Sequence, residues 1–261
     1  MSDENLAGSF NSIADDYDAY RGGYPDEVVS DIIYISGVSN VSRALEIGCG
    51  TGQATKSFAK SGMSIVCVEP GLNLMKKAQA NLASQDHVKF ENSKFEDYDL
   101  NGHTYDLVYA AQSFHWVDKS RSYDMVHRAL KPGALFAAFW KIGGPQSDPL
   151  SIALSEIYAS YLPDYKKLSI SEFEEDIFAD LRKMLDSKKF RGCQLRRYKT
   201  ADDVAEAEAY IKAVSTTSSI AILDPDRKQE MFSKFRNTIL SHGGAVVSKT
   251  NEVMLVCGFA I

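Results

Sequence analysis

Short apolar runs alternate with longer stretches of amphipathic sequence along the chain. The runs have the length of buried strands, and the stretches between them repeat apolar residues at helical spacing. This alternation predicts an α/β fold, in which strands of one sheet lie between layers of helices. The predicted strands cover residues 44–47, 64–68, 88–90, 105–110, 135–140, 192–199 and 253–259.

Helices are predicted between these strands. One of them carries Met231, Phe235 and Ile239 as an apolar stripe, which we interpret as core. Glycines and the Lys131-Pro132-Gly133 string are expected to end the helices that precede them. The predicted helices cover residues 27–35, 52–60, 71–83, 119–130, 202–214 and 226–240, with two more inside 149–187.

The composition favours one large domain. The chain has 261 residues and 44% apolar residues, enough for a sizeable core. Its net charge of −6 argues against a nucleic-acid partner, which would favour a basic surface. No secretory signal and no membrane-length apolar run is visible. We expect a cytoplasmic protein without a membrane partner, whose four cysteines are reduced.

A glycine-rich turn follows the first predicted strand and opens the next helix. Gly48, Gly50 and Gly52 alternate after Glu46, so the backbone can turn tightly and a ligand can approach. The dinucleotide pattern would need a third glycine at Gln53, and the P-loop pattern fails as well. A carboxylate at this place would repel a pyrophosphate and suits a cationic ligand. A second acid, Glu69, ends the next strand, where it can accept from two ribose hydroxyls.

These residues resemble the class I S-adenosylmethionine-dependent methyltransferases. The family's E/D-x-G-x-G-x-G motif matches Glu46 to Gly52, and its second acid matches Glu69. The resemblance implies a doubly wound, Rossmann-like sheet of seven strands, with the last strand antiparallel between the fifth and sixth. It also implies S-adenosylmethionine as the cofactor, with Glu46 near the methionine part. The expected cofactor-binding residues are Arg21, Glu46, Gly48, Cys49, Gly50, Glu69, Pro70, Met75, Ser93, Phe95 and Gln112.

One position departs from the family pattern. Lys94 stands where these enzymes commonly carry an acid that accepts from the adenine amino group. A lysine cannot accept a hydrogen bond. The backbone at Phe95, or the side chain of Asn92, Ser93 or Glu96, is then left to contact the adenine.

The string Ala-Gln-Ser-Phe-His-Trp-Val-Asp at 111–118 resembles the type 11 small-molecule branch, which includes trans-aconitate-like methyltransferases. The resemblance extends over 1–261 as a single domain, with residues 1–36 as an N-terminal cover and 143–187 as a helical lid insertion. Arg21 in the cover could meet a carboxylate of the cofactor or of an anionic substrate. The expected substrate-pocket residues are Tyr17, Phe114, His115, Trp116 and Trp140.

The resemblance implies an enzyme that methylates a small carboxylate, hydroxyl or amine. His115 is the candidate for a catalytic base, with lining of the pocket as the alternative role. The chain lacks the motifs of base-methylating enzymes, and its histidines lack the spacing of metal ligands. The competing functions are a regulatory S-adenosylmethionine-binding protein without turnover and a dinucleotide oxidoreductase. The sequence does not identify the acceptor or the oligomeric state.

Overall fold

The computed structural model describes residues 14–20, 22–143, 148–162, 170–201, 203–248 and 252–261. The chain divides into two compact units, which we describe separately. Unit 1 comprises residues 1–21, 142–175 and 199–252, and unit 2 comprises residues 22–141, 176–198 and 253–261. Arg21 and the segments 144–147 and 163–169 of the expected lid lie outside the described residues.

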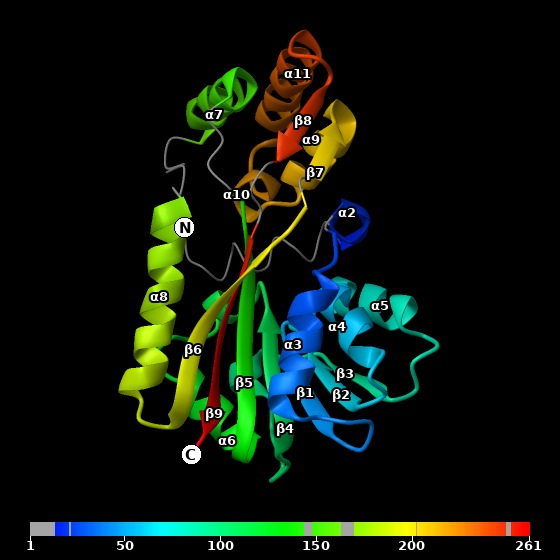
Figure 1. Ribbon diagram of the computed structural model, residues 1–261. Coiled ribbons are helices and arrows are strands. Elements are labelled where there is room, and N and C mark those ends of the chain that lie inside the picture. Colours follow the sequence, from blue (N-terminus) through cyan, green and yellow to red (C-terminus); the bar gives the residue numbers. More distant parts are fainter. Residues whose placement is uncertain (1–13, 21, 144–147, 163–169, 202, 249–251) are drawn as a thin grey trace. The chain divides into compact units, whose positions relative to one another are not determined.

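Unit 2 is built on a seven-stranded sheet in the order β3-β2-β1-β4-β5-β9-β6 (Figure 1). The strands β1 to β5 pair in parallel, and β9 runs antiparallel between β5 and β6, as the family resemblance implied. The strands are β1 (Arg43–Ile47), β2 (Ser64–Val68), β3 (Val88–Glu91), β4 (Tyr105–Ala111), β5 (Leu130–Ile142), β6 (Phe190–Lys199) and β9 (Glu252–Ala260).

Helices cover both faces of this sheet because side chains alternate across each strand. On β5, Leu135, Ala137 and Phe139 join the core shared with α3, α4 and α5, whereas Phe136 faces Phe114, Tyr123 and Phe190 on the opposite side. This is the expected doubly wound arrangement. The helices and 3₁₀ turns of unit 2 are α3 (Asp26–Ser36), α4 (Gln53–Ala59), α5 (Leu72–Asn81), η2 (Phe95–Asp97), η3 (Phe114–Trp116) and α6 (Ser122–Ala129).

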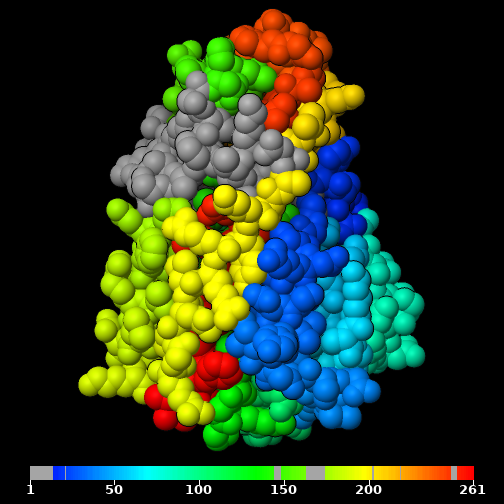
Figure 2. Space-filling model, in the orientation of Figure 1, coloured from blue at the N-terminus to red at the C-terminus, as the bar shows by residue number. Residues whose placement is uncertain are grey.

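A polar cluster joins α3 to β6 at the surface of unit 2. These elements lie side by side in Figure 2, where α3 is blue and β6 is yellow. Arg196 Nη1 and the Tyr198 hydroxyl both donate to Asp31 Oδ2, at 3.0 and 2.9 Å. The cluster thus fixes the helix that precedes β1 against the β6 edge of the sheet.

Unit 1 has a core of its own. Leu154, Ile211, Met231, Phe235 and Ile239 are among its buried side chains, which confirms the predicted core stripe of α11. The chain forms the following elements in this unit: α2 (Ala14–Tyr20), α7 (Pro149–Tyr161), β7 (Asp203–Glu206), α9 (Ala207–Ser215), α10 (Ser218–Ala221), α11 (Pro225–Ser241) and β8 (Ala245–Ser248). Helix α8 (Ile170–Asp186) begins in unit 1 and ends in unit 2.

Two sequence-based predictions of elements are wrong. The helix expected over 202–214 begins only at Ala207, because Asp203–Glu206 pair with Ala245–Ser248 as an antiparallel two-stranded sheet that was not predicted. The helix expected over 119–130 is shorter, and Leu130 already begins β5. The proline and glycine that were expected to precede this strand lie inside it, at a register shift beside Tyr105 and Leu107.

Candidate active site

The glycine turn connects β1 to α4 at the carboxyl end of the sheet. Gly48, Gly50 and Gly52 all have positive φ angles of 67°, 56° and 86°, which L side chains rarely adopt. At Gly48 there is no room for a side chain either, because a Cβ there would lie 2.6 Å from Ser113 Cβ. The turn therefore requires glycine at this position for both conformation and space.

Glu69 is tied directly to this turn. Its carboxylate is 5% exposed and accepts from the backbone N–H of Gly50 at 2.8 Å and from that of Gly71 at 2.8 Å. Burial raises the pKa of Glu69, although the two backbone donors oppose the shift. A carboxylate has about four lone-pair sites, so two acceptor positions remain for the hydroxyls of a diol.

Glu46 lies beneath the turn, in the interior. It is 1% exposed, and its Oε2 accepts from the hydroxyls of Thr55 and Tyr109 at 2.6 and 2.8 Å and from the Cys67 thiol at 3.7 Å. Burial raises its pKa to about 7, although these donors oppose the shift. Thr55, Tyr109 and Cys67 were not predicted from the sequence as partners of Glu46. Two residues could have indicated them: Tyr109 carries a hydroxyl within the apolar run of β4, and Thr55 carries one at the start of α4. A buried acid needs hydrogen-bond donors of this kind.

The segment after β4 packs on the glycine turn. Gln112 has a φ of 57°, and Ser113 Oγ donates to the carbonyl of Ile47. Gln112 Oε1 is buried and has no hydrogen-bond partner among the described residues. A buried acceptor of this kind favours a bound donor, such as an ammonium group.

The aromatic residues in and around this segment differ in burial and in contacts. Phe114 is 3% exposed and packs its ring on Phe136 and Tyr123 at 4.8 and 5.4 Å, so it is a core residue. His115 and Trp116 are half-buried, with ring centroids 4.8 Å apart. Trp140 is 1% exposed and donates its indole N–H to His115 Nδ1 at 3.2 Å.

The loops after β2 and β3 are held together beside Glu69. The Asn92 side-chain amide donates to the carbonyls of Glu69 and Pro70 at 2.8 and 3.0 Å. The Glu96 carboxylate accepts from the backbone N–H of Asp118 at 2.6 Å, which joins this region to the segment after β4. Asn92 and Glu96, two of the three side chains that could have replaced the missing acid, therefore already bind the protein.

The remaining predicted residues fall into three groups. Met75 and Phe95 are buried, Ser93 is half-buried with its hydroxyl donating to the carbonyl of Lys94, and Pro70 is exposed. Cys49 is buried in the glycine turn, with its thiol 3.7 Å from the carbonyl of Gly50. Tyr17 belongs to α2 of unit 1, and Arg21 lies outside the described residues.

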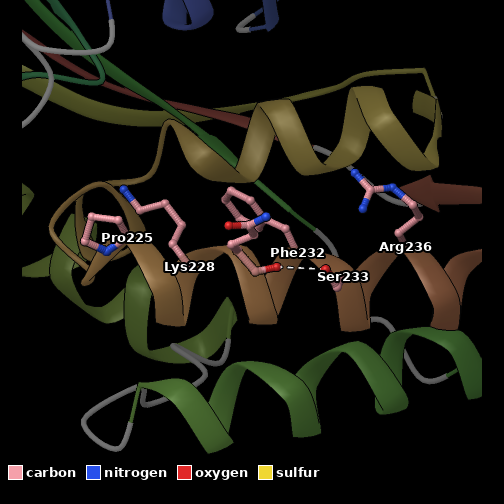
Figure 3. A pocket seen from close by; sticks show the side chains of 6 residues that line it. Pro225, Lys228, Phe232, Ser233 and Arg236 are labelled. Carbon is pink, nitrogen blue, oxygen red and sulfur yellow. Dashed lines mark hydrogen bonds between the residues drawn. The ribbon is translucent and has the colours of Figure 1, made fainter.

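A shallow hollow on unit 1 is lined along one face of α11 (Figure 3). Its two cationic side chains bind the protein itself: Lys228 Nζ donates to the carbonyl of Ala221 at 2.9 Å, and Arg236 pairs with Glu208. We assign no ligand to this hollow.

The arrangement in unit 2 fits a ligand with a diol and an ammonium group. Glu69 offers acceptors at the end of β2, Gln112 offers a buried acceptor at the end of β4, and the glycine turn lies between them on β1. In doubly wound sheets, ligands bind at these carboxyl ends. Among the described residues there is neither a group of metal-ligating side chains nor a helix long and apolar enough to cross a membrane.

The segment that carries the glycine turn is similar to known methyltransferases. Residues 45–138, from β1 to β5, match the family model described as a methyltransferase domain. An uncharacterized methyltransferase of Mycobacterium bovis is 28% identical over 139 residues, which are 53% of this chain and 54% of that protein. The chain thus spans about half the length of the first curated relatives it matches.

Two further matches cover more of the chain. The malonyl-[acyl-carrier protein] O-methyltransferase 2 of Ilyobacter polytropus is 25% identical over 85% of this chain and 84% of its own length. The YcgJ protein of Bacillus subtilis has a similar fold, with a TM-score of 0.57 and 15% identity over 90% of this chain and 98% of its own. S-adenosylmethionine is the cofactor of this family. The segment from β1 to β5 therefore belongs to the methyltransferase domain family, in agreement with the resemblance to class I S-adenosylmethionine-dependent methyltransferases.

Proposed function

We propose that this protein transfers the methyl group of S-adenosylmethionine to a small-molecule acceptor that presents a carboxylate, a hydroxyl or an amine. The observation that carries the proposal is Glu69, which is buried at the end of β2 and bonded to Gly50 of the glycine turn. When bound, the cofactor supplies an activated methyl group on a sulfonium. The protein's part is to align the acceptor and exclude water.

Each residue then has a defined role in binding. Glu69 accepts from the ribose hydroxyls with its remaining lone pairs, and Gln112 Oε1 accepts from the ammonium of the methionine part. Glu46 keeps the turn in place from below through Thr55 and Tyr109. When ionised, its buried carboxylate also contributes negative potential near a cationic ligand.

Carboxylate acceptors receive additional support. The relative from Ilyobacter polytropus is named as an O-methyltransferase of malonyl-[acyl-carrier protein], and it aligns with 85% of this chain. We therefore place small carboxylic acids first in the panel of acceptors. A single-domain organisation with residues 1–36 as a cover and 143–187 as a lid, a cytoplasmic location and the absence of a nucleic-acid partner remain predictions.

Binding of the cofactor tests the proposal. Glu69→Ala should weaken S-adenosylmethionine binding by about 1–3 kcal/mol, because the ribose loses a charged acceptor. Titration calorimetry measures this, with Asp86→Ala as the control, since Asp86 is an exposed acid before β3 at the opposite end of the sheet. The control should bind as the wild type does, and NAD should not bind either protein.

Turnover separates the enzyme from a regulatory binding protein. With small carboxylic acids, phenols and amines as acceptors, the wild type should release S-adenosylhomocysteine. Unchanged affinity of a folded Glu69→Ala variant would exclude the ribose role. Tight cofactor binding without product on any acceptor would favour the regulatory protein.

A further inference from the structure

The hydrogen bond between Trp140 and His115 determines where the imidazole carries its proton. An indole N–H can only donate. His115 Nδ1, 3.2 Å from Trp140 Nε1, must therefore be the acceptor and cannot carry a proton while this bond exists. The neutral ring then has its proton on Nε2, so the ring offers a donor at that nitrogen.

The Nε2–H group is accessible. Among the described residues no hydrogen bond reaches His115 Nε2, and the atom does not belong to the buried polar atoms that lack a partner. Trp140, by contrast, is fully buried, so the ring turns Nδ1 toward the interior. His115 thus presents its N–H to solvent or to a ligand.

This N–H belongs to the segment that packs on the glycine turn. Ser113, two residues before His115, bonds the carbonyl of Ile47 and fills the space in front of Gly48. Trp140 reaches the same place from β5, which pairs with β4 next to the turn. The two side chains therefore lie at the carboxyl end of the central strands, where the proposed cofactor would bind.

The charged groups that act on His115 are Lys119, after β4, and Asp176, on α8. Burial, with a smaller effect of Lys119 in the same direction, lowers the pKa of His115 to about 4, although Asp176 opposes the shift. The ring is therefore neutral at physiological pH, and the Trp140 bond opposes its protonation as well, since only the neutral ring can accept at Nδ1.

We propose that Trp140 is a positioning residue that holds His115 as a hydrogen-bond donor, and that the methyl acceptor is an anionic oxygen, a carboxylate or an ionised phenol, which accepts from His115 Nε2–H. This inference rests on the proposed function and narrows its acceptor class. In this state Nδ1 of His115 accepts from Trp140 and Nε2 already carries a proton. The ring therefore has no free lone pair with which to take a proton from a neutral hydroxyl or an ammonium.

Methyl transfer to such an anionic oxygen needs no base. A lone pair of the anionic oxygen forms the new C–O bond while the C–S bond of the sulfonium breaks and its electron pair stays on sulfur. The products are a neutral ester or ether and a neutral thioether, and no proton is left over. A neutral hydroxyl would leave one proton that the site must remove.

Two substitutions of His115 distinguish a donor from a base. The amide nitrogen of glutamine can replace Nε2 as a donor but cannot accept a proton. His115→Gln should therefore keep kcat/KM for a carboxylate within about tenfold, whereas His115→Ala should lose more. Equal losses of about 10²–10⁴-fold in both variants would show a base and overturn the proposal.

Trp140→Phe tests the positioning role because it keeps an aromatic ring and removes the donor. The pKa of His115, followed by NMR with His115→Gln for assignment, should rise by about 0.5–1 unit, since the neutral ring loses a hydrogen bond. In kinetics, Trp140→Phe should reduce kcat/KM in the wild type but not in His115→Gln. An unchanged His115 titration in folded Trp140→Phe would overturn the role.

The two proposals fail in different ways. If S-adenosylmethionine does not bind, the proposed function fails, while the NMR titration still reports whether Trp140 holds the ring. If the cofactor binds and only amines or neutral alcohols are methylated, the proposed function holds and the anionic acceptor is overturned.

Discussion

Glu46 shows how a single residue of a sequence motif can serve the fold. Its carboxylate is buried and accepts from Thr55, Tyr109 and Cys67, and none of these three partners is a cation. Burial disfavours the charged carboxylate relative to the protonated acid, which is why the pKa of Glu46 rises from 4.5 to about 7. The folded state therefore binds more protons than the unfolded chain between these two pH values.

The sign of the pH effect follows from this difference in proton binding. The contribution of Glu46 to the free energy of unfolding is fully present below pH 4.5. It falls by up to about 3 kcal/mol as the pH rises through 7. Glu46→Gln cannot ionise, so the free energy of unfolding of the variant minus that of the wild type should rise from pH 4.5 to pH 8. Urea unfolding at both pH values measures this difference. A constant difference would contradict the raised pKa.

At the scale of elements, the glycine turn combines a backbone requirement with a packing requirement. Gly37 ends α3 with a φ of 66°, nearly that of Gly48, yet a Cβ at Gly37 would have nothing within 4 Å. The two glycines thus separate conformational cost from steric cost. They form a matched pair for mutation.

Alanine at each position should reveal the two costs. Gly37→Ala should lose about 1–2 kcal/mol of stability from the left-handed conformation alone. Gly48→Ala should lose about 1–3 kcal/mol more, because the new methyl group displaces Ser113. Thermal and urea unfolding compare the variants, and calorimetry should show weaker cofactor binding only for Gly48→Ala. Equal losses of stability in the two variants would mean that the contact with Ser113 adds no steric cost at Gly48.

The elements also show how far the sequence could predict this molecule. The strands of the sheet and the glycine turn followed from local patterns, because a buried strand and a tight turn each leave a local signal. Segment 203–206 did not, since its alanine and glutamate favour a helix and only pairing with 245–248 makes it a strand. The contact of Trp140 with His115 could not be predicted either, because it joins β5 to the turn η3, 25 positions apart in the sequence.

At the scale of the whole molecule, the described residues of each unit include a buried core of their own. Phe58 is fully buried in the core of unit 2, where it stacks on Tyr109 at 4.0 Å. Phe235 is fully buried in the core of unit 1, with the Tyr158 ring at 4.8 Å. No residue is shared by these two cores within the described chain.

Each core should therefore respond to its own mutation. Phe58→Ala and Phe235→Ala should each cost about 3–5 kcal/mol locally. Hydrogen exchange with mass spectrometry should show faster exchange of unit 2 amides in the first variant and of unit 1 amides in the second. The same peptides becoming faster in both variants would show that the two cores unfold as one.

The placement of β9 has a consequence for the order in which the sheet can be completed during synthesis. β6 leaves the ribosome before β9, yet β9 separates it from β5. Until residues 252–260 have emerged, the facing edges of β5 and β6 have no correct partner, and pairing them with each other would be an error that must be reversed. Such long-range closure slows folding and exposes strand edges that can aggregate. The nascent chain thus exposes both of these edges while residues 200–251 are being made.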